Sequence, residues 1–394
     1  MLLVKRLRIK INKQAKEYFE FASEKCRLVY NFALAERIAL YEKEGKSISL
    51  YEQKRQLPIL KQQYPEYAKV YNKCLSAMYF RLDKAYKNFF KRGNKGFPKF
   101  KRKGQFISQE YPGIYIKKLE TYMFKIPSGK GFNTIIARTY EPVPDNYKTV
   151  TILKDKHDYY ASFIIEKENK DYKDNNSYLA LDLGVKTLAT GFDSEGNFLE
   201  ISKFKHYTKH LDRIKSKRDK CKKGSRRCKK WSKILHKHYK KYYNRVNDYL
   251  HKVSYYLTNK ISANNIIIGK LNLNNMKTQQ SWFNRIIFNE WKIGKLVELL
   301  RYKTTLYGKK LIEIDESYTT QRCSKCGKLN KMELKDRTYK CSCGFILDRD
   351  KNSAINIMKK YFKGVAHADN LNKIIELTSV SNLNSTNVYT FEYI

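Results

Sequence analysis

One stretch sets the architecture of this chain, and it reads Tyr178-Leu-Ala-Leu-Asp-Leu-Gly-Val-Lys-Thr-Leu-Ala-Thr-Gly-Phe-Asp-Ser-Glu-Gly-Asn-Phe-Leu-Glu200. It indicates a buried strand, a glycine turn, a second strand and a hairpin into a third strand. Residues 169–177, which include Asn175-Asn-Ser177, are polar and predict a linker before this stretch. A new domain therefore begins near Tyr178.

Before the linker the pattern changes twice. Residues 2–10 alternate apolar and cationic side chains, which predicts a strand, and residues 11–105 show mostly helical spacing. Residues 106–168 consist of short β-type runs separated by turn residues. We expect residues 1–10 and 106–168 to form one small β-barrel, with residues 11–105 as a helical insertion.

After the three-strand opening, residues 205–260 are helical and strongly cationic, with a predicted break at Gly224-Ser225. Periodicity predicts the remaining elements, which are strands at 265–269 and 310–316 and helices at 289–307 and 351–361. Residues 365–394 show no periodicity beyond one weak apolar patch. We expect them to be a tail that is partly disordered.

The charge of the chain indicates a polyanionic partner. In 394 residues, 81 Lys and Arg stand against 38 Asp and Glu, a formal charge of +43, which excludes most ordinary soluble metabolic enzymes. Nucleic acid is the partner that such an excess favours, and an acidic membrane surface is the alternative. No apolar run approaches the roughly 18–20 residues that a membrane span needs, so we expect an intracellular protein.

Two cationic stretches supply the candidate phosphate contacts. The second stretch, residues 215–230, holds ten cations in sixteen residues. It could simply be a solvated helical face, but like charges at that density repel one another unless phosphates lie between them. The candidate nucleic-acid-binding residues are Lys91, Arg92, Lys95, Lys99, Lys101, Arg102 and Lys103 in the first stretch, and Lys215, Lys217, Arg218, Lys222, Lys223, Arg226, Arg227, Lys229 and Lys230 in the second.

Four of the eight cysteines form a candidate zinc site. The sequence reads Cys323-Ser-Lys-Cys326, then fourteen residues, then Cys341-Ser-Cys343-Gly344. Two such knuckles can close a tetrahedral Zn²⁺ site, although the second has one residue rather than two between its cysteines. Unmetallated thiols are the alternative.

Two acids stand out by their position. Asp182 lies inside an apolar strand, where an uncompensated carboxylate would cost several kcal/mol to bury, so it should meet a metal ion or pair with an Arg or Lys. Asp350 stands at the entrance to the helix that follows the cysteines, where it could bind metal or cap the helix. Its neighbour Asp348 could also serve as the cap.

These residues carry a resemblance to the TnpB family of transposon-encoded RNA-guided DNA nucleases, which are related to the compact type V CRISPR effectors. The matching motifs, which cover nearly the whole chain, are Leu181-Asp-Leu-Gly-Val-Lys-Thr-Leu-Ala-Thr190, Asn244-Arg245 with Asp248 and His251-Lys252, Tyr302-Lys303 with Tyr307-Gly308, Ser317-Tyr-Thr-Thr-Gln-Arg-Cys-Ser-Lys-Cys-Gly327, Asp348-Arg-Asp-Lys-Asn-Ser-Ala-Ile-Asn-Ile357, Cys26-Arg-Leu-Val-Tyr-Asn31, Arg81-Leu-Asp-Lys-Ala-Tyr-Lys-Asn-Phe-Phe90 and Pro98-Lys-Phe-Lys101.

The resemblance implies a multidomain α/β protein. Its parts would be a β-barrel wedge domain (1–10 and 106–168) with a helical recognition insertion (11–105), then an RNase-H-like RuvC domain (178–320 and 345–364) with an inserted zinc ribbon (321–344). In such nucleases three carboxylates hold Mg²⁺. Asp182 matches the first of these acids and Asp350 matches the last.

The middle acid is missing from its usual place. The family carries a Glu at the end of the strand that is Ile266-Ile-Ile-Gly269 here, so Gly269 stands in the Glu position. Some members of the wider group carry a relocated Glu downstream, at a motif that Glu316-Ser-Tyr-Thr-Thr320 matches apart from its last residue. We expect Glu316 to be the third ligand, with Glu298 and Glu290 as weaker options and loss of nuclease activity as the alternative.

The sequence therefore predicts an Mg²⁺-dependent RNA-guided DNA endonuclease, cytoplasmic and associated with the prokaryotic nucleoid. It would carry structural Zn²⁺, an element-derived guide RNA and a double-stranded DNA target, with catalytic residues Asp182, Glu316 and Asp350. Two other hypotheses are a nuclease-inactive RNA-guided DNA-binding protein, resembling a repressor, and a DNA transposase. The sequence leaves open whether the protein is a monomer or a dimer.

Overall fold

The computed structural model describes most of the chain, namely residues 1–91, 96–156, 158–184, 187–204, 208–270, 292–333, 336–364, 368–378 and 387–391. It consists of two units, Met1–Glu168 and Asn169–Ile394. The division falls where the sequence predicts the linker to begin. Among the described helices, none combines the length and the apolar character needed to cross a membrane.

The first unit contains one antiparallel seven-stranded sheet in the order β2-β6-β7-β1-β5-β4-β3. Its strands are β1 (Leu2–Lys10), β2 (Gln109–Pro112), β3 (Lys117–Glu120), β4 (Met123–Ile126), β5 (Ile135–Thr139), β6 (Thr149–Asp155) and β7 (Asp158–Glu166). The N-terminal strand β1 pairs with β7 from Leu2↔Glu166 to Ile9↔Tyr159 and also with β5, so it joins the strands of residues 106–168, as predicted, and lies in the middle of their sheet. In the described residues β2 and β3 are the two ends of an open sheet, and no ladder between them closes the predicted barrel.

The helices of this unit come from the predicted helical insertion. They are α1 (Lys13–Glu44), α2 (Leu50–Arg55), α3 (Leu57–Gln63) and α4 (Asn72–Phe90), with short 3₁₀ turns η1 (Pro65–Lys69) and η2 (Gly113–Tyr115). Asn12 caps α1 by accepting a hydrogen bond from the Ala15 amide, and Gly45 ends it at φ 64°. The helices share one apolar core with the sheet, including Phe19 of α1, Leu82 of α4 and Phe163 of β7.

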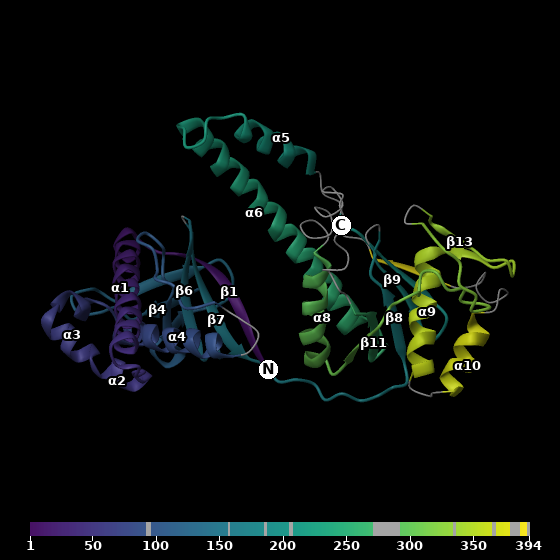
Figure 1. The fold of residues 1–394 in the computed structure, drawn as a ribbon, viewed down its shortest axis with the longest axis horizontal. Helices are drawn as coiled ribbons and strands as arrows, with labels where there is room; N and C mark the ends of the chain where they lie inside the picture. Colours follow the sequence, from purple (N-terminus) through teal and green to yellow (C-terminus); the bar gives the residue numbers. More distant parts are fainter. Residues whose placement is uncertain are drawn as a thin grey trace. The chain divides into compact units, whose positions relative to one another are not determined.

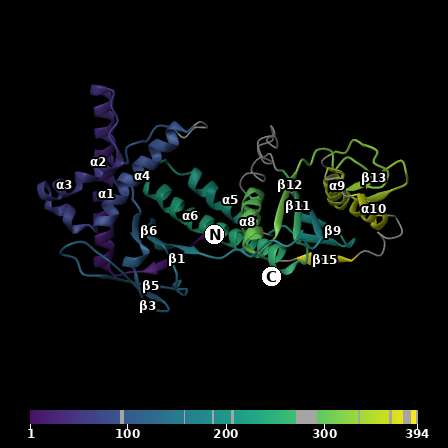
Figure 2. The same ribbon diagram turned by 90° about the horizontal axis from the view of Figure 1, so that it is seen from below.

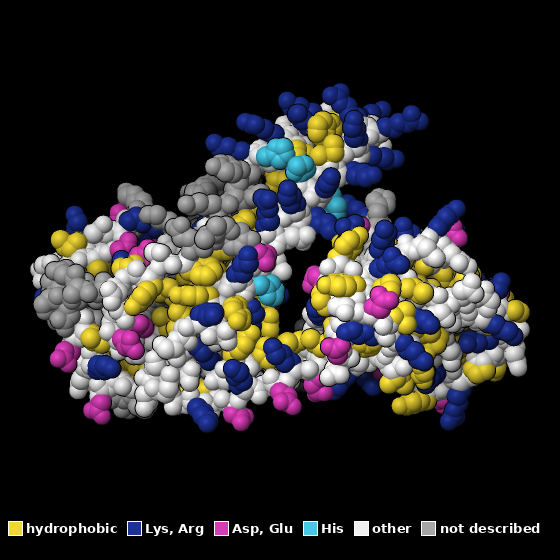
Figure 3. Space-filling model, turned by 180° about the vertical axis from the view of Figure 1, so that it is seen from behind, with side chains coloured by type: hydrophobic (Ala, Val, Ile, Leu, Met, Phe, Trp, Pro, Cys, Tyr) yellow, Lys and Arg dark blue, Asp and Glu magenta, His cyan; other side chains and the backbone are white. Residues whose placement is uncertain are grey.

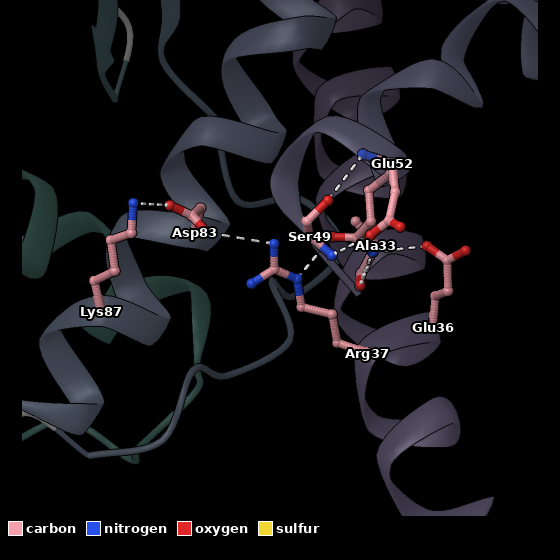
Figure 4. A network of polar contacts seen from close by, with 8 residues as sticks. Ala33, Glu36, Arg37, Ser49, Glu52, Asp83 and Lys87 are labelled. Carbon is pink, nitrogen blue, oxygen red and sulfur yellow. Dashed lines mark hydrogen bonds and ion pairs between the residues drawn. The ribbon is translucent and has the colours of Figure 1, made fainter. Parts of the chain in front are cut away.

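A partly buried polar network joins three of these helices (Figure 4). Arg37 of α1 donates through Nε to Gln53 Oε1 of α2 at 2.7 Å, and Gln53 donates to Glu36 Oε2 at 2.6 Å. Arg37 Nη2 also lies 3.5 Å from Asp83 Oδ1 of α4, and Asp83 pairs with Lys87 at 2.8 Å. Each acid in this network therefore meets a cation or an amide.

The second unit is built on a six-stranded sheet in the order β12-β11-β8-β9-β10-β15. The strands are β8 (Tyr178–Asp182), β9 (Thr187–Asp193), β10 (Phe198–Ser202), β11 (Asn265–Gly269), β12 (Lys310–Ile314) and β15 (Val388–Phe391), and a separate two-stranded ladder joins β13 (Thr338–Lys340) to β14 (Ile346–Asp348). Strands β8, β9 and β10 form the predicted antiparallel opening, and β11 and β12 run parallel to β8.

Helices cover both faces of this sheet, with α8 on one side and α9 on the other (Figure 1). They are α5 (Thr208–Asp219), α6 (Arg226–Tyr255) with the π-helical turn η3 (Tyr256–Lys260), α8 (Ile293–Leu306), α9 (Arg349–Gly364) and α10 (Ala368–Leu377). Leu179 and Leu181 of β8 pack with α6 and α8, whereas Tyr178 and Ala180 pack with α9. Side chains alternate between the faces along each strand, as expected for a sheet buried on both sides.

The C-terminal segment corrects one expectation. Residues 365–394 were predicted to form a partly disordered tail, but α10 packs against α9 (Figure 2), and β15 pairs in parallel with β10 as an edge strand of the sheet. The reason is tertiary, because a four-residue strand and a ten-residue helix carry too little periodicity to be recognised without the surfaces that they cover. Residues 368–378 and 387–391 therefore belong to the fold of the second unit.

Candidate active site and metal centre

Asp182 is the last residue of β8 and faces the side of the sheet that α9 covers. Tyr178 and Ala180 point to α9, and the alternation of side chains places Asp182 on the same face. Burial is the first cause that raises the pKa of its carboxyl group to about 7, and the negative charges of Asp350 and Glu316 add to it. No ion pair joins Asp182 to a described residue, so the predicted alternative of an Arg or Lys partner gains no support within the described chain.

Glu316 lies over Gly269, beside Asp182. Strand β11 pairs with β8 as far as Ile268↔Leu181, so the next residues, Gly269 and Asp182, are neighbours across the ladder. A Cβ atom built on Gly269 would stand 1.8 Å from Glu316 Oε2 and 2.8 Å from Glu316 Cβ. The carboxylate of Glu316 thus occupies the space that a side chain at position 269 would need.

Strand alternation explains how Glu316 reaches this place. In β12, Ile312 and Ile314 pack on the α9 side of the sheet, and β12 lies beside β11 with Ile314 opposite Gly269. Glu316 continues this alternation two residues beyond Ile314. By contrast, Glu313 points to the other face and binds Arg301 of α8 at 2.7 Å.

The turn that carries Glu316 is held by polar contacts. Asp315 accepts hydrogen bonds from the Ser317 hydroxyl at 2.6 Å and from Lys360 Nζ at 2.8 Å. This contact with Lys360 lowers the pKa of Asp315 to about 2, whereas burial raises the pKa of Glu316. Tyr318 adopts φ 65°, a left-handed backbone that a bulky residue rarely takes. The backbone of this turn is therefore constrained on both sides of Glu316.

A hydroxyl pair links the Glu316 turn to Asp182. Thr319 Oγ1 donates to the backbone oxygen of Glu316 at 2.9 Å and lies 3.2 Å from Ser353 Oγ of α9. Ser353 also lies close enough to Asp182 to lower the pKa of that carboxyl group. Thr319 and Ser353 are buried and thus bridge two of the three candidate acids.

Asp350 lies in the first turn of α9 and does not cap the helix. Asp348 takes that role, because its Oδ1 accepts hydrogen bonds from the Asp350 and Lys351 amides at 2.9 and 3.2 Å. Asp350 Oδ2 instead lies 3.8 Å from the Cβ position of Gly184, two residues after Asp182. Its Oδ1 pairs with Arg349 Nη2 at 3.2 Å. The three acids therefore lie at the same end of the sheet.

The weaker options for the middle acid find no support in the described residues. Glu298 of α8 pairs with Lys295 at 3.0 Å and its side chain is 64 % exposed. Glu290 lies outside the described residues. Of the candidates considered, Glu316 is the described acid that lies against Gly269.

The four predicted cysteine ligands form a compact cluster. The Sγ atoms of Cys323, Cys326, Cys341 and Cys343 all lie within 4.8 Å of one another, with Cys323 to Cys343 at 3.8 Å and Cys326 to Cys341 at 3.5 Å. Four sulfurs bound to one Zn²⁺ at roughly 2.3 Å stand about 3.8 Å apart. The donor set and its spacing fit a zinc ion, and Tyr339 and Phe345 pack beneath the cluster as its apolar support.

The second cationic stretch forms a helical hairpin of α5 and α6. Gly224, at φ 85°, and the N-cap Ser225 make the predicted break between the two helices. Lys and Arg side chains cover the hairpin in the space-filling view (Figure 3). Of the nine predicted residues, Arg218 is half-buried and pairs with Asp219. The other eight are exposed, namely Lys215, Lys217, Lys222, Lys223, Arg226, Arg227, Lys229 and Lys230.

The first cationic stretch follows α4. Lys91, Lys99, Arg102 and Lys103 are exposed, and the Lys101 backbone is held by the Asn31 amide through hydrogen bonds of 2.8 and 3.0 Å. The other two predicted contacts, Arg92 and Lys95, lie outside the described residues.

Sequence reasoning missed the residues that surround the acids. Thr319, Ser353 and the Asp315–Lys360 pair have no distinctive spacing, because they come from a turn and a helix that are adjacent only in the fold. A usable signal did exist in the alternation of Ile312, Ile314 and Glu316, which places the acid on one face of a strand.

Three family models match parts of the chain. Residues 162–280 match the "Probable transposase" model of IS605 OrfB, residues 294–357 match a Cas12f1-like TNB domain, and residues 1–46 match a helix-turn-helix domain of IS605 OrfB. Over that last range the structure has the strand β1 followed by a single uninterrupted helix, α1.

Two curated relatives cover most of the chain. One, from Streptomyces pristinaespiralis, is named an RNA-guided DNA endonuclease and is 26 % identical over 84 % of this chain and 82 % of its own length. The other, InsQ of Escherichia coli K12, carries the same name and is 28 % identical over 70 % of this chain and 71 % of its own. Among solved structures, a Cas12f1–sgRNA–target DNA complex matches with a TM-score of 0.52 and 15 % identity, over 88 % of this chain and 83 % of that one, and so shares the fold.

Proposed function

Because the chain belongs to the TnpB family, we propose that it is an RNA-guided DNA endonuclease that hydrolyses phosphodiester bonds with Asp182, Glu316 and Asp350. The observation that carries the proposal is the position of Glu316. Its carboxylate fills the space above Gly269, beside Asp182, so an acid from the turn after the neighbouring strand β12 would replace the one absent from the usual strand.

The three carboxylates offer the type of donor atom that would bind magnesium. Mg²⁺ prefers oxygen ligands, and burial together with mutual repulsion raises the pKa of Asp182, so a bound cation would relieve the repulsion. When bound, Mg²⁺ supplies Lewis-acid activation of the phosphodiester and of water. The chain's own part is to hold the carboxylates in place: the sheet positions Asp182, the Asp315–Lys360 contact positions the turn of Glu316, and α9 positions Asp350.

The four cysteines would hold a structural Zn²⁺. A closed set of four thiolates leaves no open position for substrate, which is typical of zinc that stabilises a fold and not of zinc that catalyses. The site would tie the turn after Glu316 to the strand that leads into α9, because Cys323 follows that turn and β14 precedes α9.

The remaining parts of the proposal concern the nucleic acids. The exposed cations of the α5–α6 hairpin and of residues 99–103 would contact the phosphates of a guide RNA encoded by the element and of a double-stranded DNA target. Base pairing, and not side chains, would select the target. The first unit would serve as the wedge and recognition part, and the second as the RuvC nuclease with its zinc ribbon.

The test is cleavage of a matched double-stranded DNA by the complex co-purified with its RNA, with and without Mg²⁺. Wild type should cut only with Mg²⁺, and Glu316→Gln and Asp182→Asn should each lower the rate by a factor of about 10³, because each removes several kcal/mol of metal-mediated stabilisation. The control is Glu298→Gln, since that acid is exposed on α8 and should leave the rate unchanged.

Two substitutions test whether Glu316 replaces the acid that is missing at position 269. Gly269→Glu alone should abolish cutting, because two side chains cannot share the space above β11, and adding Glu316→Ala to it should restore part of the rate. Guide-dependent binding by wild type without any cutting would contradict the nuclease assignment and make this a targeting protein. Unchanged cutting by Glu316→Gln would remove that residue from the site.

The zinc assignment has its own test. Cys326→Ser should lower the zinc content and the thermal midpoint together, because metal binding contributes directly to the folding of such a site. Cys228→Ser, on the α5–α6 hairpin, is the control. An unchanged zinc content in Cys326→Ser would overturn the assignment.

A further inference from the structure

One face of α9 holds the chain segment that joins Glu316 to the first cysteine knuckle. The side chains at positions 352, 353, 356 and 360 make hydrogen bonds with residues 315–324. Steps of three and four residues return to the same side of an α-helix, so these four side chains share one face. Two of them are asparagines, Asn352 and Asn356, whose amides carry no charge and both donate and accept hydrogen bonds.

The two asparagines bind the backbone of this segment at three residues. Asn356 Nδ2 donates to the Thr319 carbonyl at 2.8 Å and to the Arg322 carbonyl at 2.6 Å. Asn352 Nδ2 donates to the same Arg322 carbonyl at 2.8 Å, and its Oδ1 accepts from the Ser324 amide at 3.0 Å. Asn352 is fully buried and Asn356 is 5 % exposed, so water competes little for these bonds. We call these four hydrogen bonds the amide clamp.

The amide clamp connects parts of the chain that carry two of the candidate acids. Thr319 lies three residues after Glu316, and Asn352 lies two residues after Asp350, while the other clamped residues flank Cys323. A shift of the segment along α9 would therefore change the separation of Glu316 from Asp350. Because the ligands of a metal ion must keep a narrow range of positions, such a shift would weaken the binding of the ion.

A buried asparagine elsewhere in the second unit provides a comparison. Asn265 is 2 % exposed, donates to Asp174 Oδ1 at 2.9 Å and accepts from the Tyr172 hydroxyl at 2.8 Å. It begins β11, whereas Gly269 ends that strand, and its hydrogen bonds hold the linker and not the Glu316 turn. Loss of either kind of asparagine should lower stability, but only the amide clamp is attached to the segments of the acids.

We propose that Asn352 and Asn356 are positioning residues, which hold the Glu316 turn on α9 and so keep Glu316 and Asp350 at the separation that a bound divalent cation needs. The inference rests on the proposed function, because it takes the carboxylates as ligands of a metal ion. It adds that the affinity of this metal site depends on two neutral side chains that are not themselves ligands.

The experiment measures Mn²⁺ binding to the full-length, zinc-loaded protein in complex with its RNA, by electron paramagnetic resonance. Mn²⁺ suits the same oxygen ligands as Mg²⁺. Binding to Asp182→Asn is subtracted, because it reports the ions held elsewhere, including those on the RNA. Asn356→Ala should weaken the remaining binding by about 10- to 100-fold, the usual range for residues that orient metal ligands. Asn352→Ala leaves the Arg322 carbonyl bound to Asn356 and should weaken it less.

Asn265→Ala is the matched control, which should lower the thermal midpoint and leave the Mn²⁺ affinity unchanged. Zinc content, RNA content and thermal midpoint are measured for every variant, and affinities are compared below the onset of unfolding. If Asn356→Ala lowered the thermal midpoint but bound Mn²⁺ as wild type does, the proposal would be overturned, since the amide clamp would then only stabilise the fold. If Asn356→Ala does not fold, the milder Asn352→Ala decides the same question.

Failure of the proposed function gives a different pattern. A wild type that binds no more Mn²⁺ than Asp182→Asn would contradict the metal site and this inference together. A wild type that never cuts DNA, but whose Mn²⁺ binding falls in Asn356→Ala and not in Asn265→Ala, would contradict the nuclease function and leave the amide clamp standing.

Discussion

The two units treat their partly buried acids in opposite ways. In the first unit, Asp83 meets Arg37 and Lys87, and Glu36 accepts hydrogen bonds from two glutamine amides. In the second unit, Asp182 faces Asp350 and Glu316, and the nearby cations Arg349 and Lys360 are too few to neutralise all three. Acids that are neutralised by their neighbours hold helices together, whereas the repulsion between clustered acids would be relieved by a bound cation.

The first two predictions replace an Asp by Asn, once in each unit, and the larger effect is expected in the first unit. Asp83→Asn should lower the free energy of unfolding by about 3 kcal/mol, because the poorly exposed Arg37 loses its charged partner. Urea denaturation followed by circular dichroism measures it. Glu17→Gln, whose contact with Lys13 is long and exposed, is the control and should change little. If Asp83→Asn left the free energy of unfolding unchanged, the network would not be what joins the three helices.

The matching change in the second unit should have the opposite sign. Asp182→Asn should raise the free energy of unfolding of the metal-free protein by about 2 kcal/mol at neutral pH, because it removes a buried charge that two other acids repel. The same denaturation experiment, carried out without divalent cations, measures it. Destabilisation by this substitution would show that Asp182 has a structural partner and would erase the contrast between the units.

A smaller effect on the cleavage rate is expected from a substitution that removes only the hydrogen bonds that position Glu316 and leaves every charge in place. Thr319→Val keeps the shape of the side chain but loses the hydrogen bonds to the Glu316 carbonyl and to Ser353, so cleavage should slow by about tenfold with little change in stability. The neighbouring Thr320→Val is the control. If Thr319→Val lowered stability and rate in parallel, its role would be packing alone.

The smallest expected effect concerns buried cations that have only neutral partners. Lys303 is 7 % exposed and donates to the His251 carbonyl and to Ser254 Oγ at 2.7 and 2.8 Å, and burial lowers its pKa to about 8. Between about pH 8 and 10 the unfolded chain therefore binds more protons than the folded one, so Lys303 should make the free energy of unfolding rise with pH. Denaturation at pH 8, 9 and 10 should show a steeper rise for wild type than for Lys303→Met, and parallel curves would contradict this.

Much of the candidate site could be read from the sequence because its signals are local. The apolar run around Asp182 predicted a partner for the carboxylate, and the spacing of Cys323, Cys326, Cys341 and Cys343 predicted that their sulfur atoms would cluster, as they do. The roles of Asp348 and Asp350 could not be separated, since both stand at the same helix entrance and only the hydrogen bonds to the helix amides identify the cap. The last strand, β15, was missed because its pairing with β10 joins segments nearly two hundred residues apart.

By itself, the sequence predicted the main strands and helices before residue 365, the cationic hairpin, the cysteine cluster and the absence of an acid at Gly269, because alternation, spacing and charge are properties of neighbouring residues. Only the tertiary structure decided that Glu316 stands above that glycine, since the contact depends on the register of β12 against β11 and on which face of the sheet α9 covers. The same holds for the amide clamp, whose asparagines and backbone partners come from a helix and a turn that meet only when the chain is folded.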